Sequence, residues 1–244
     1  MPLAPAGFEF PKVDEGQEVL FIGQIHIADF NQWQKSTREL NGEGIIYMFG
    51  TIIKEYDSYR LNDILLRYSD QTHDLLAIDL PEGSREFGIF PERDMMIYEE
   101  INIPDQGTST FDLEDMDAND ANIYSELEDL IKNYDVRKSF KFLGLPSPVQ
   151  HCTLFEAEMK QQNLLFYSKA EYTNEMFMET YLRLRECSQD WRLLLELDMM
   201  LFPQLEKHEG SFNSGMDGVF FVMLRQKELD EIRVEKAITI YQST

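Results

Sequence analysis

The residues best suited to bind a metal ion are acidic and lie near the middle of the chain. Asp115, Asp117 and Asn119 alternate along the sequence and are followed by Glu126, which matches the spacing of oxygen ligands in an EF-hand calcium loop. The position where that loop requires glycine for its sharp turn is Asp120, and no helical pattern precedes the segment. We therefore favour a solvated acidic loop that leads into a helix, and we predict no metal site.

Two other groups combine side chains used in nucleophilic or metal chemistry. They are His26 with Asp29, and His151 and Cys152 with Glu156 and Glu158. A cysteine nucleophile needs an orienting base and an oxyanion donor, and no local motif indicates either one. The sequence also lacks the phosphate-loop, dinucleotide, metalloprotease and hydrolase motifs. We predict no catalytic residue and no cofactor, and we interpret His26 as a core histidine on a strand.

The charge of the chain is its most unusual property. It contains 45 acidic and 22 basic residues, which gives a net charge of −23. Nucleic acids and anionic lipid surfaces are bound through clusters of Lys and Arg, so neither is expected as a partner. The same charge attracts a basic protein and accelerates its association. That the charge serves only solubility is an alternative that stays open.

The negative charge is concentrated in residues 94–131, a segment in which Arg93 is the last basic residue before Lys132. Its second part predicts a helix, because apolar residues recur there on one face at helical spacing. These residues are Ile123, Leu127, Leu130, Ile131 and Tyr134. Asp120 or Asn122 is expected to cap the helix, with acidic side chains on its outer face. We predict that the segment binds a basic protein partner through Asp112, Glu114, Asp115, Asp117, Asp120 and Glu126.

Strands must hold these segments in place, and β-branched and aromatic residues predict them in both halves of the chain. The main predicted strands are 18–27, 45–49, 62–68, 74–80, 86–103, 191–198, 219–224 and 234–241. A second helix is expected within 170–187, and the apolar segment 140–150 is expected to be a packed loop.

The two halves repeat the same order of features. A strand with Gln24, a loop, Gly44 and an apolar strand are matched by a strand with Glu196, a loop, Gly218 and an apolar strand at nearly equal spacing. This order predicts a duplicated β unit, although two hydrophobic hairpins would produce a similar pattern by chance. Gln24 and Glu196 then occupy equivalent places. They either hold a polar ligand in a cleft between the halves or satisfy backbone groups inside the sheets, and we favour the second role.

A set of motifs in the same order resembles the YwqG-like family. The matching segments are residues 8–11, 21–25, 44–49, 143–146, 149–150, 191–195 and 217–221. The resemblance implies a mixed α+β fold with coiled sheets and internal duplication, and it brings no established activity. Similar proteins occur among the genes of bacterial toxin and immunity systems. Family members usually carry an N-terminal Gly-Gly-x-Pro segment that we expect this chain to lack, and Phe140 and Glu196 replace a histidine and a glutamine of the family pattern.

We therefore expect a single α+β domain over residues 1–244, with mixed antiparallel sheets, halves at 8–103 and 140–242, and an acidic helical connector at 104–139. Two cysteines are too few for a disulfide framework, and no signal peptide or membrane segment is recognisable, so we predict a cytoplasmic protein. The expected function is that of an immunity protein that neutralises a basic toxin by direct binding. The alternative is a small-molecule-binding protein, or an enzyme, that uses a cleft between the halves.

Overall fold

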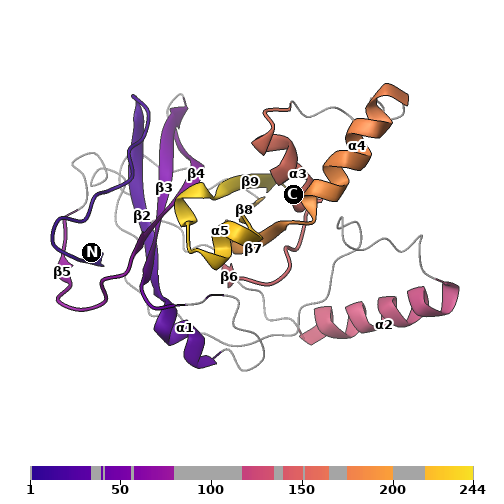
Figure 1. Cartoon of the computed structure of the whole chain (residues 1–244), viewed down its shortest axis with the longest axis horizontal. Coiled ribbons are helices and arrows are strands. Elements are labelled where there is room, and N and C mark those ends of the chain that lie inside the picture. The colour runs from indigo at the N-terminus through magenta and orange to yellow at the C-terminus, as the bar shows by residue number, and fades with distance from the viewer. Residues whose placement is uncertain are drawn as a thin grey trace. The chain divides into compact units, whose positions relative to one another are not determined.

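Antiparallel strands form the framework of the chain, which a computed structural model describes over most of its length. The described residues are 2–33, 40, 42–55, 58–79, 117–134, 140–150, 152–164, 175–199 and 218–243. Within these ranges the strands form three sheets, accompanied by five α-helices and one 3-10 helix (Figure 1). This mixture confirms the predicted α+β class.

The first compact unit is built around the three-stranded sheet β2-β3-β4 (Figure 1). The strands are β2 (Gln17–His26), β3 (Ile45–Glu55) and β4 (Ser58–Ser69), all antiparallel. Helix α1 (Ile27–Trp33) follows β2, and a small second sheet pairs β1 (Leu3–Ala4) with β5 (Leu76–Ala77). β3 is buried along most of its length, as its continuous apolar sequence predicts.

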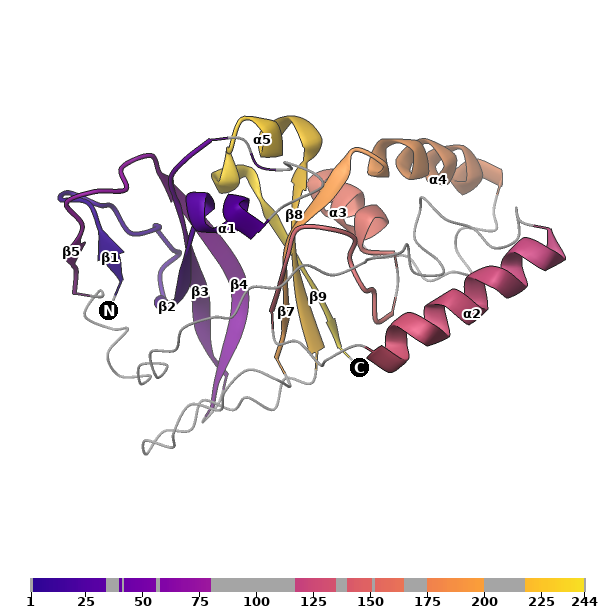
Figure 2. The same cartoon turned by 90° about the horizontal axis from the view of Figure 1, so that it is seen from below.

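The second compact unit is built around the four-stranded sheet β6-β7-β8-β9. The strands are β6 (Phe140–Phe142), β7 (Trp191–Asp198), β8 (Gly218–Arg225) and β9 (Ile238–Ser243). The unit also contains α3 (Thr153–Gln161) and α4 (Glu175–Ser188), which pack against each other (Figure 2), and α2 (Ala118–Tyr134). Leu154 and Ala157 of α3 pack on β7, β8 and β9 to form the core.

The segment between β8 and β9 belongs almost entirely to the first unit, although both strands belong to the second. It contains α5 (Gln226–Asp230) and η4 (Val234–Lys236), and residues 227–237 belong to the first unit, where η4 packs against β4. The division therefore does not follow the simple sequence halves.

The strand pair β2-β3 of the first unit matches the pair β7-β8 of the second residue by residue. β2 has a bulge at Ile22 in its pairing with β3, and β7 has a bulge at Leu194 in its pairing with β8. Two residues after each bulge lie Gln24 and Glu196, paired with Tyr47 and Phe221. The corresponding core residues are Val19 and Trp191, Phe21 and Leu193, Ile45 and Val219, Tyr47 and Phe221, Phe49 and Met223, and Leu65 and Ile238. These matches bear out the predicted duplication of a β-rich unit.

A glycine begins the second strand of each repeat, or precedes it, for a steric reason. A Cβ atom on Gly44 would lie 2.4 Å from the ring of Tyr68, and one on Gly218 would lie 2.4 Å from the backbone oxygen of Gln242 and 2.7 Å from the Tyr241 hydroxyl. In both units a tyrosine of the third strand therefore lies over the glycine. Gly44 also has a φ of +138°, which disfavours other residues.

Several expectations for individual elements were wrong. Residues 140–142 form the edge strand β6 and are not part of a loop. Helix α3 was not predicted. The predicted strand at 74–80 is reduced to the two residues of β5, and residues 234–236 are a 3-10 helix that precedes the last strand. The predicted strand 86–103 lies outside the described residues.

Over the ranges that the structure covers, no helix has both the length and the apolar character that crossing a membrane requires.

Candidate functional site

Helix α2 is the described part of the predicted partner-binding segment. It starts at Ala118, and Asp117 caps it: Oδ1 of Asp117 accepts the backbone N–H groups of Asn119 at 2.9 Å and Asp120 at 3.0 Å. The expectation that Asp120 or Asn122 caps the helix was wrong, because Asp117 satisfies the free amides one turn earlier. Asp120 lies in the first turn, where its charge is favoured by the helix dipole.

Helix α2 also separates the residues whose spacing resembles that of an EF-hand loop. Asn119 and Glu126 both lie within one continuous helix. At a rise of about 1.5 Å per residue, Asp117 and Glu126 are separated by roughly 13 Å along its axis, too far to bind one ion. Among the residues that the structure describes, no group of three or more His, Cys, Asp or Glu side chains is arranged to hold a metal.

The predicted partner-binding residues divide into two groups. Asp120 and Glu126 are exposed on α2, and the capping residue Asp117 is exposed as well. Asp129, one turn further on, is exposed as well. The other three predicted residues, Asp112, Glu114 and Asp115, lie outside the described residues.

The apolar stripe of α2 is exposed, which the sequence did not predict. Periodicity indicates that one face of the helix should be buried. Instead, Ile123 and Leu130 are each 57% exposed and Leu127 is 43% exposed. These three residues, which we call the α2 stripe, lie on one face at helical spacing. Helix α2 thus presents exposed apolar side chains and exposed carboxylates together.

Gln24 has a structural role inside the first unit. Its Oε1 accepts the backbone N–H of Leu3 at 3.0 Å, and its Nε2 lies 3.2 Å from Nε2 of His26. The hydroxyl of Tyr47 donates to the backbone oxygen of Leu3 at 3.0 Å, and burial raises the pKa of Tyr47 to about 12. Gln24 and Tyr47 together hold the start of the chain against the sheet.

Glu196 has the same role in the second unit. Its Oε2 accepts the backbone N–H of Ser147 at 3.0 Å and lies 3.8 Å from Nζ of Lys141. The Lys141 ammonium also donates to the Ser147 hydroxyl at 3.1 Å. Gln24 and Glu196 therefore each satisfy a backbone amide of an adjoining segment, which is the role that we favoured for them.

The structure describes the histidine and cysteine groups only in part. His26 is half-buried and is hydrogen-bonded to Gln24, while Asp29 is exposed on α1. Cys152 is half-buried at the start of α3 and His151 lies outside the described residues.

The two carboxylates of α3 are buried and have structural partners. Oε2 of Glu156 accepts the side-chain amide of Gln242 at 2.8 Å, and Oε1 of Gln242 accepts the backbone N–H groups of Val149 and Gln150 at 2.7 and 3.0 Å. This chain of bonds fastens the loop after β6 to β9.

Glu158 is the centre of a buried polar cluster in the second unit. The residue is 2% exposed, and its Oε2 accepts Nη2 of Arg225 at 2.6 Å and Nε1 of Trp191 at 2.9 Å. Its Oε1 accepts the side-chain amide of Gln162 at 2.6 Å. Burial by itself would raise the pKa of Glu158, but the hydrogen bonds from Trp191 and Gln162 and the charge of Arg225 hold it below its usual range.

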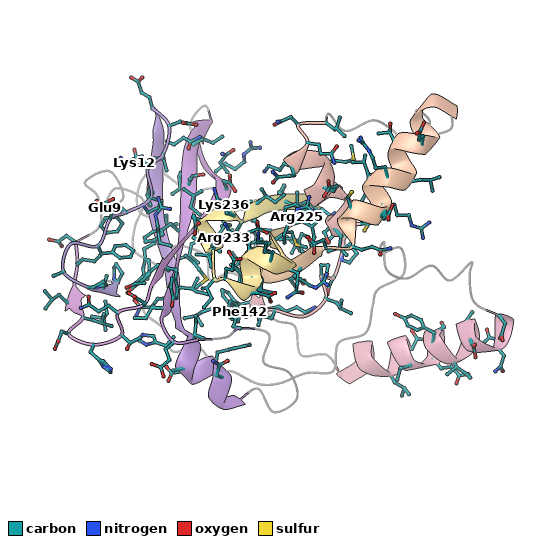
Figure 3. The ribbon with its side chains drawn as sticks, viewed as in Figure 1. Glu9, Lys12, Phe142, Arg225, Arg233 and Lys236 are labelled. Carbon is teal, nitrogen blue, oxygen red and sulfur yellow. The ribbon has the colours of Figure 1, made fainter. Side chains whose placement is uncertain are left out.

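Arg225 completes this cluster, and its position is marked in Figure 3. Its guanidinium lies 4.6 Å from the centre of the Trp191 ring and also donates to the backbone oxygen of Cys187 at 3.3 Å. No local pattern predicted this cluster, because α3, β7 and β8 bring together residues that are far apart along the chain. Glu158 and Trp191 are each 2% exposed and the Arg225 side chain is 28% exposed, so the cluster extends from the core toward the surface.

Comparison with known proteins adds a family and no activity. A search of the curated proteins finds no match to the chain. The profile of one family, described as a domain of unknown function (DUF1963), matches residues 1–243. Because that match covers nearly all of the sequence, the chain belongs to the DUF1963 family.

Proposed function

We propose that the chain is a protein-binding molecule that engages a basic protein partner through helix α2. The observation that carries the proposal is the combination of exposed carboxylates and the exposed α2 stripe on one helix. An amphipathic helix whose apolar face is open is the form in which many proteins enter a groove on a partner. The polar groups described above in the two sheets, by contrast, are already occupied by internal partners.

The apolar and acidic side chains of α2 make different contributions to such a complex. Burying the exposed parts of Ile123, Leu127 and Leu130 would contribute on the order of 3 kcal/mol, which makes them anchors. Asp120, Glu126 and the other carboxylates lie at the rim, where they raise the association rate of a basic partner and select against acidic ones. Their effect must weaken at high salt.

The finer proposal is that this partner is a toxin domain and that the chain is a YwqG-like immunity protein acting in the cytoplasm. It rests on the resemblance to the YwqG-like family and on the net charge of −23, which complements a basic toxin. The alternative of a ligand-binding protein or enzyme has less support, because Gln24 and Glu196 each bind a backbone amide of their own unit.

A comparison of three variants tests the proposal. The first variant reverses charge on α2 at Asp120, Glu126 and Asp129, and the second replaces the α2 stripe by serine. The control reverses the same number of charges at exposed positions that are not part of α2, namely Glu15, Asp70 and Glu235. Each variant is used as bait for basic proteins of the source cell, and the affinity of the partner retained by the wild type is measured as a function of salt.

We expect the charge reversal on α2 to weaken binding by about tenfold or more at low salt and to flatten the salt dependence. The serine variant should weaken binding at every salt concentration. The control should retain most of the affinity. If the control weakens binding as much as the reversal on α2, only the overall charge matters and the proposed surface is wrong.

A further inference from the structure

Gln24 and Glu196 occupy equivalent positions, but they offer different groups to a second neighbour. The Glu196 carboxylate has only acceptor atoms, and its Oε2 both accepts the N–H of Ser147 at 3.0 Å and lies 3.8 Å from the Lys141 ammonium. The Gln24 amide has one acceptor oxygen and an NH2 group that can only donate. A backbone amide and a cation therefore suit Glu196 together, whereas the NH2 end of Gln24 requires an acceptor.

The backbone of β1 determines which way the Gln24 amide points. The N–H of Leu3 can only donate, so the Gln24 atom at 3.0 Å from it must be the oxygen. The NH2 group of Gln24 then lies 3.2 Å from Nε2 of His26. A hydrogen bond forms there only if this ring nitrogen carries no proton. The geometry thus requires a neutral His26 whose proton is on Nδ1.

Strand β1 depends on this arrangement for part of its attachment to the sheet. The N–H of Leu3 is bound by Gln24, and its backbone oxygen accepts the Tyr47 hydroxyl at 3.0 Å. β1 also pairs with β5, and the two short strands lie beside β2 (Figure 2). Any change that turns the Gln24 amide over therefore removes one of the contacts that hold β1.

The titratable side chains around His26 leave it as the group that changes charge near neutral pH. By register, Tyr47 of β3 and Arg67 of β4 lie on the same face of the sheet; burial raises the pKa of Tyr47 to about 12, and an arginine stays charged. β1 and β5 contain no titratable residue. Carboxylates, which stay ionised above about pH 5, lie on α1, at the ends of β3 and β4 and around β5. They are Asp29, Glu43, Asp70, Asp74 and Asp79. The exposed His73 is the other histidine that the structure describes, and it serves as a control.

We infer that protonation of His26 loosens β1, so that Leu3, Gln24 and His26 form an acid-sensitive latch in the first unit. A proton on Nε2 of His26 points at the NH2 group of Gln24, and that hydrogen bond is lost. Turning the amide over offers its oxygen to the charged ring but places the NH2 group against the N–H of Leu3. The closed latch therefore binds one proton fewer, and acid favours its opening. This inference does not depend on the proposed role of α2.

The second unit is the internal reference. The position of His26 is taken there by Asp198, which pairs with Val219 as His26 pairs with Ile45. The contacts of Ser147 with Glu196 and Lys141 involve no group that titrates between about pH 5 and 8. The Ser147 amide should therefore keep its environment over the range in which the Leu3 amide changes.

NMR of the full chain between about pH 7.5 and pH 5.5 tests the latch. The nitrogen shifts of the His26 ring report its protonation, and hydrogen exchange, corrected for the intrinsic rate at each pH, reports the protection of the Leu3 and Ser147 amides. We expect an unprotonated Nε2 at the higher pH. The protection of Leu3 should fall by about fivefold or more as His26 takes up its proton, while that of Ser147 stays constant.

Three variants distinguish the latch from general loosening in acid. Gln24→Glu provides a carboxylate that accepts from Leu3 and from a protonated His26 together, so the protection of Leu3 should rise in acid. His26→Gln provides an acceptor that does not titrate and should abolish the pH dependence, and His73→Gln should leave it unchanged.

Constant protection of Leu3 while His26 titrates in the wild type would overturn the inference, whether or not the variants fold. A His26 ring that stays neutral down to about pH 5, or an equal loss of protection in His26→Gln, would overturn it as well.

Discussion

Replacing Gly44 by alanine tests the structural core of the duplicated unit. The added Cβ would lie 2.4 Å from the ring of Tyr68 and 2.6 Å from the backbone oxygen of Ser69, and backbone cannot move aside as a flexible side chain can. Overpacking of this kind costs about 1–3 kcal/mol. The φ of +138° at Gly44 adds about 1 kcal/mol for a residue with a Cβ.

The expected loss of unfolding free energy for Gly44→Ala is therefore about 2–4 kcal/mol. For a chain of this length, that corresponds to a fall in Tm of roughly 4–16 °C. Gly218→Ala should lose about 1–3 kcal/mol, because its clash with the backbone oxygen of Gln242 is similar and its φ is not in the positive range.

Gly7→Ala is the matched control. Gly7 has a φ of +80°, but no atom lies within 4 Å of the point where an added Cβ would stand, so the substitution should cost only about 1 kcal/mol. Thermal and denaturant unfolding followed by circular dichroism compare the three variants. If Gly44→Ala and Gly218→Ala unfold at the same temperature as Gly7→Ala, close packing of a tyrosine over each glycine is refuted.

Three other predictions concern polar groups. Glu158→Gln should lower the free energy of unfolding by about 2–3 kcal/mol at neutral pH, because Arg225 loses its buried, charged partner. The pKa of Glu158 is lowered in the folded state, so its contribution to stability is complete above about pH 5 and is lost as the pH falls. The stabilities of the wild type and the variant should therefore converge in acid unfolding experiments. Asp117→Ala should reduce the helicity of α2 through loss of about 1 kcal/mol of capping energy, measured by hydrogen exchange of its first-turn amides. Burial raises the pKa of Tyr47 from 10.0 to about 12, so its contribution to stability should be complete below pH 10 and lost between pH 10 and 12. Alkaline unfolding of the wild type should show this loss of stability, and Tyr47→Phe should not show it.

The repeated sheets could be predicted from the sequence, because their central strands are long apolar runs. Each run begins at or next to a glycine, where a larger residue would clash with a tyrosine. It did not reveal β6, a three-residue strand next to Gly144 and Pro146, where turn signals dominate. It also placed the cap of α2 one turn too late, because Asp117 and Asp120 both fit the local pattern.

The candidate site shows the same limit. Spacing places Ile123, Leu127 and Leu130 on one face of a helix, but it cannot tell whether another element covers that face. The cluster of Glu158, Trp191 and Arg225 depends on contacts between distant segments, which no local pattern records. The equivalence of Gln24 and Glu196, in contrast, followed directly from the repeat.

The central claim is that α2 is the surface that binds a basic partner. The most direct measurement is the affinity of the captured partner for the wild type, for the variant with charge reversal at Asp120, Glu126 and Asp129, and for the control reversed at Glu15, Asp70 and Glu235, each at low and high salt. Loss of affinity confined to the α2 variant, with a reduced salt dependence, is the predicted result. Equal affinity of the wild type and the α2 variant would contradict the claim.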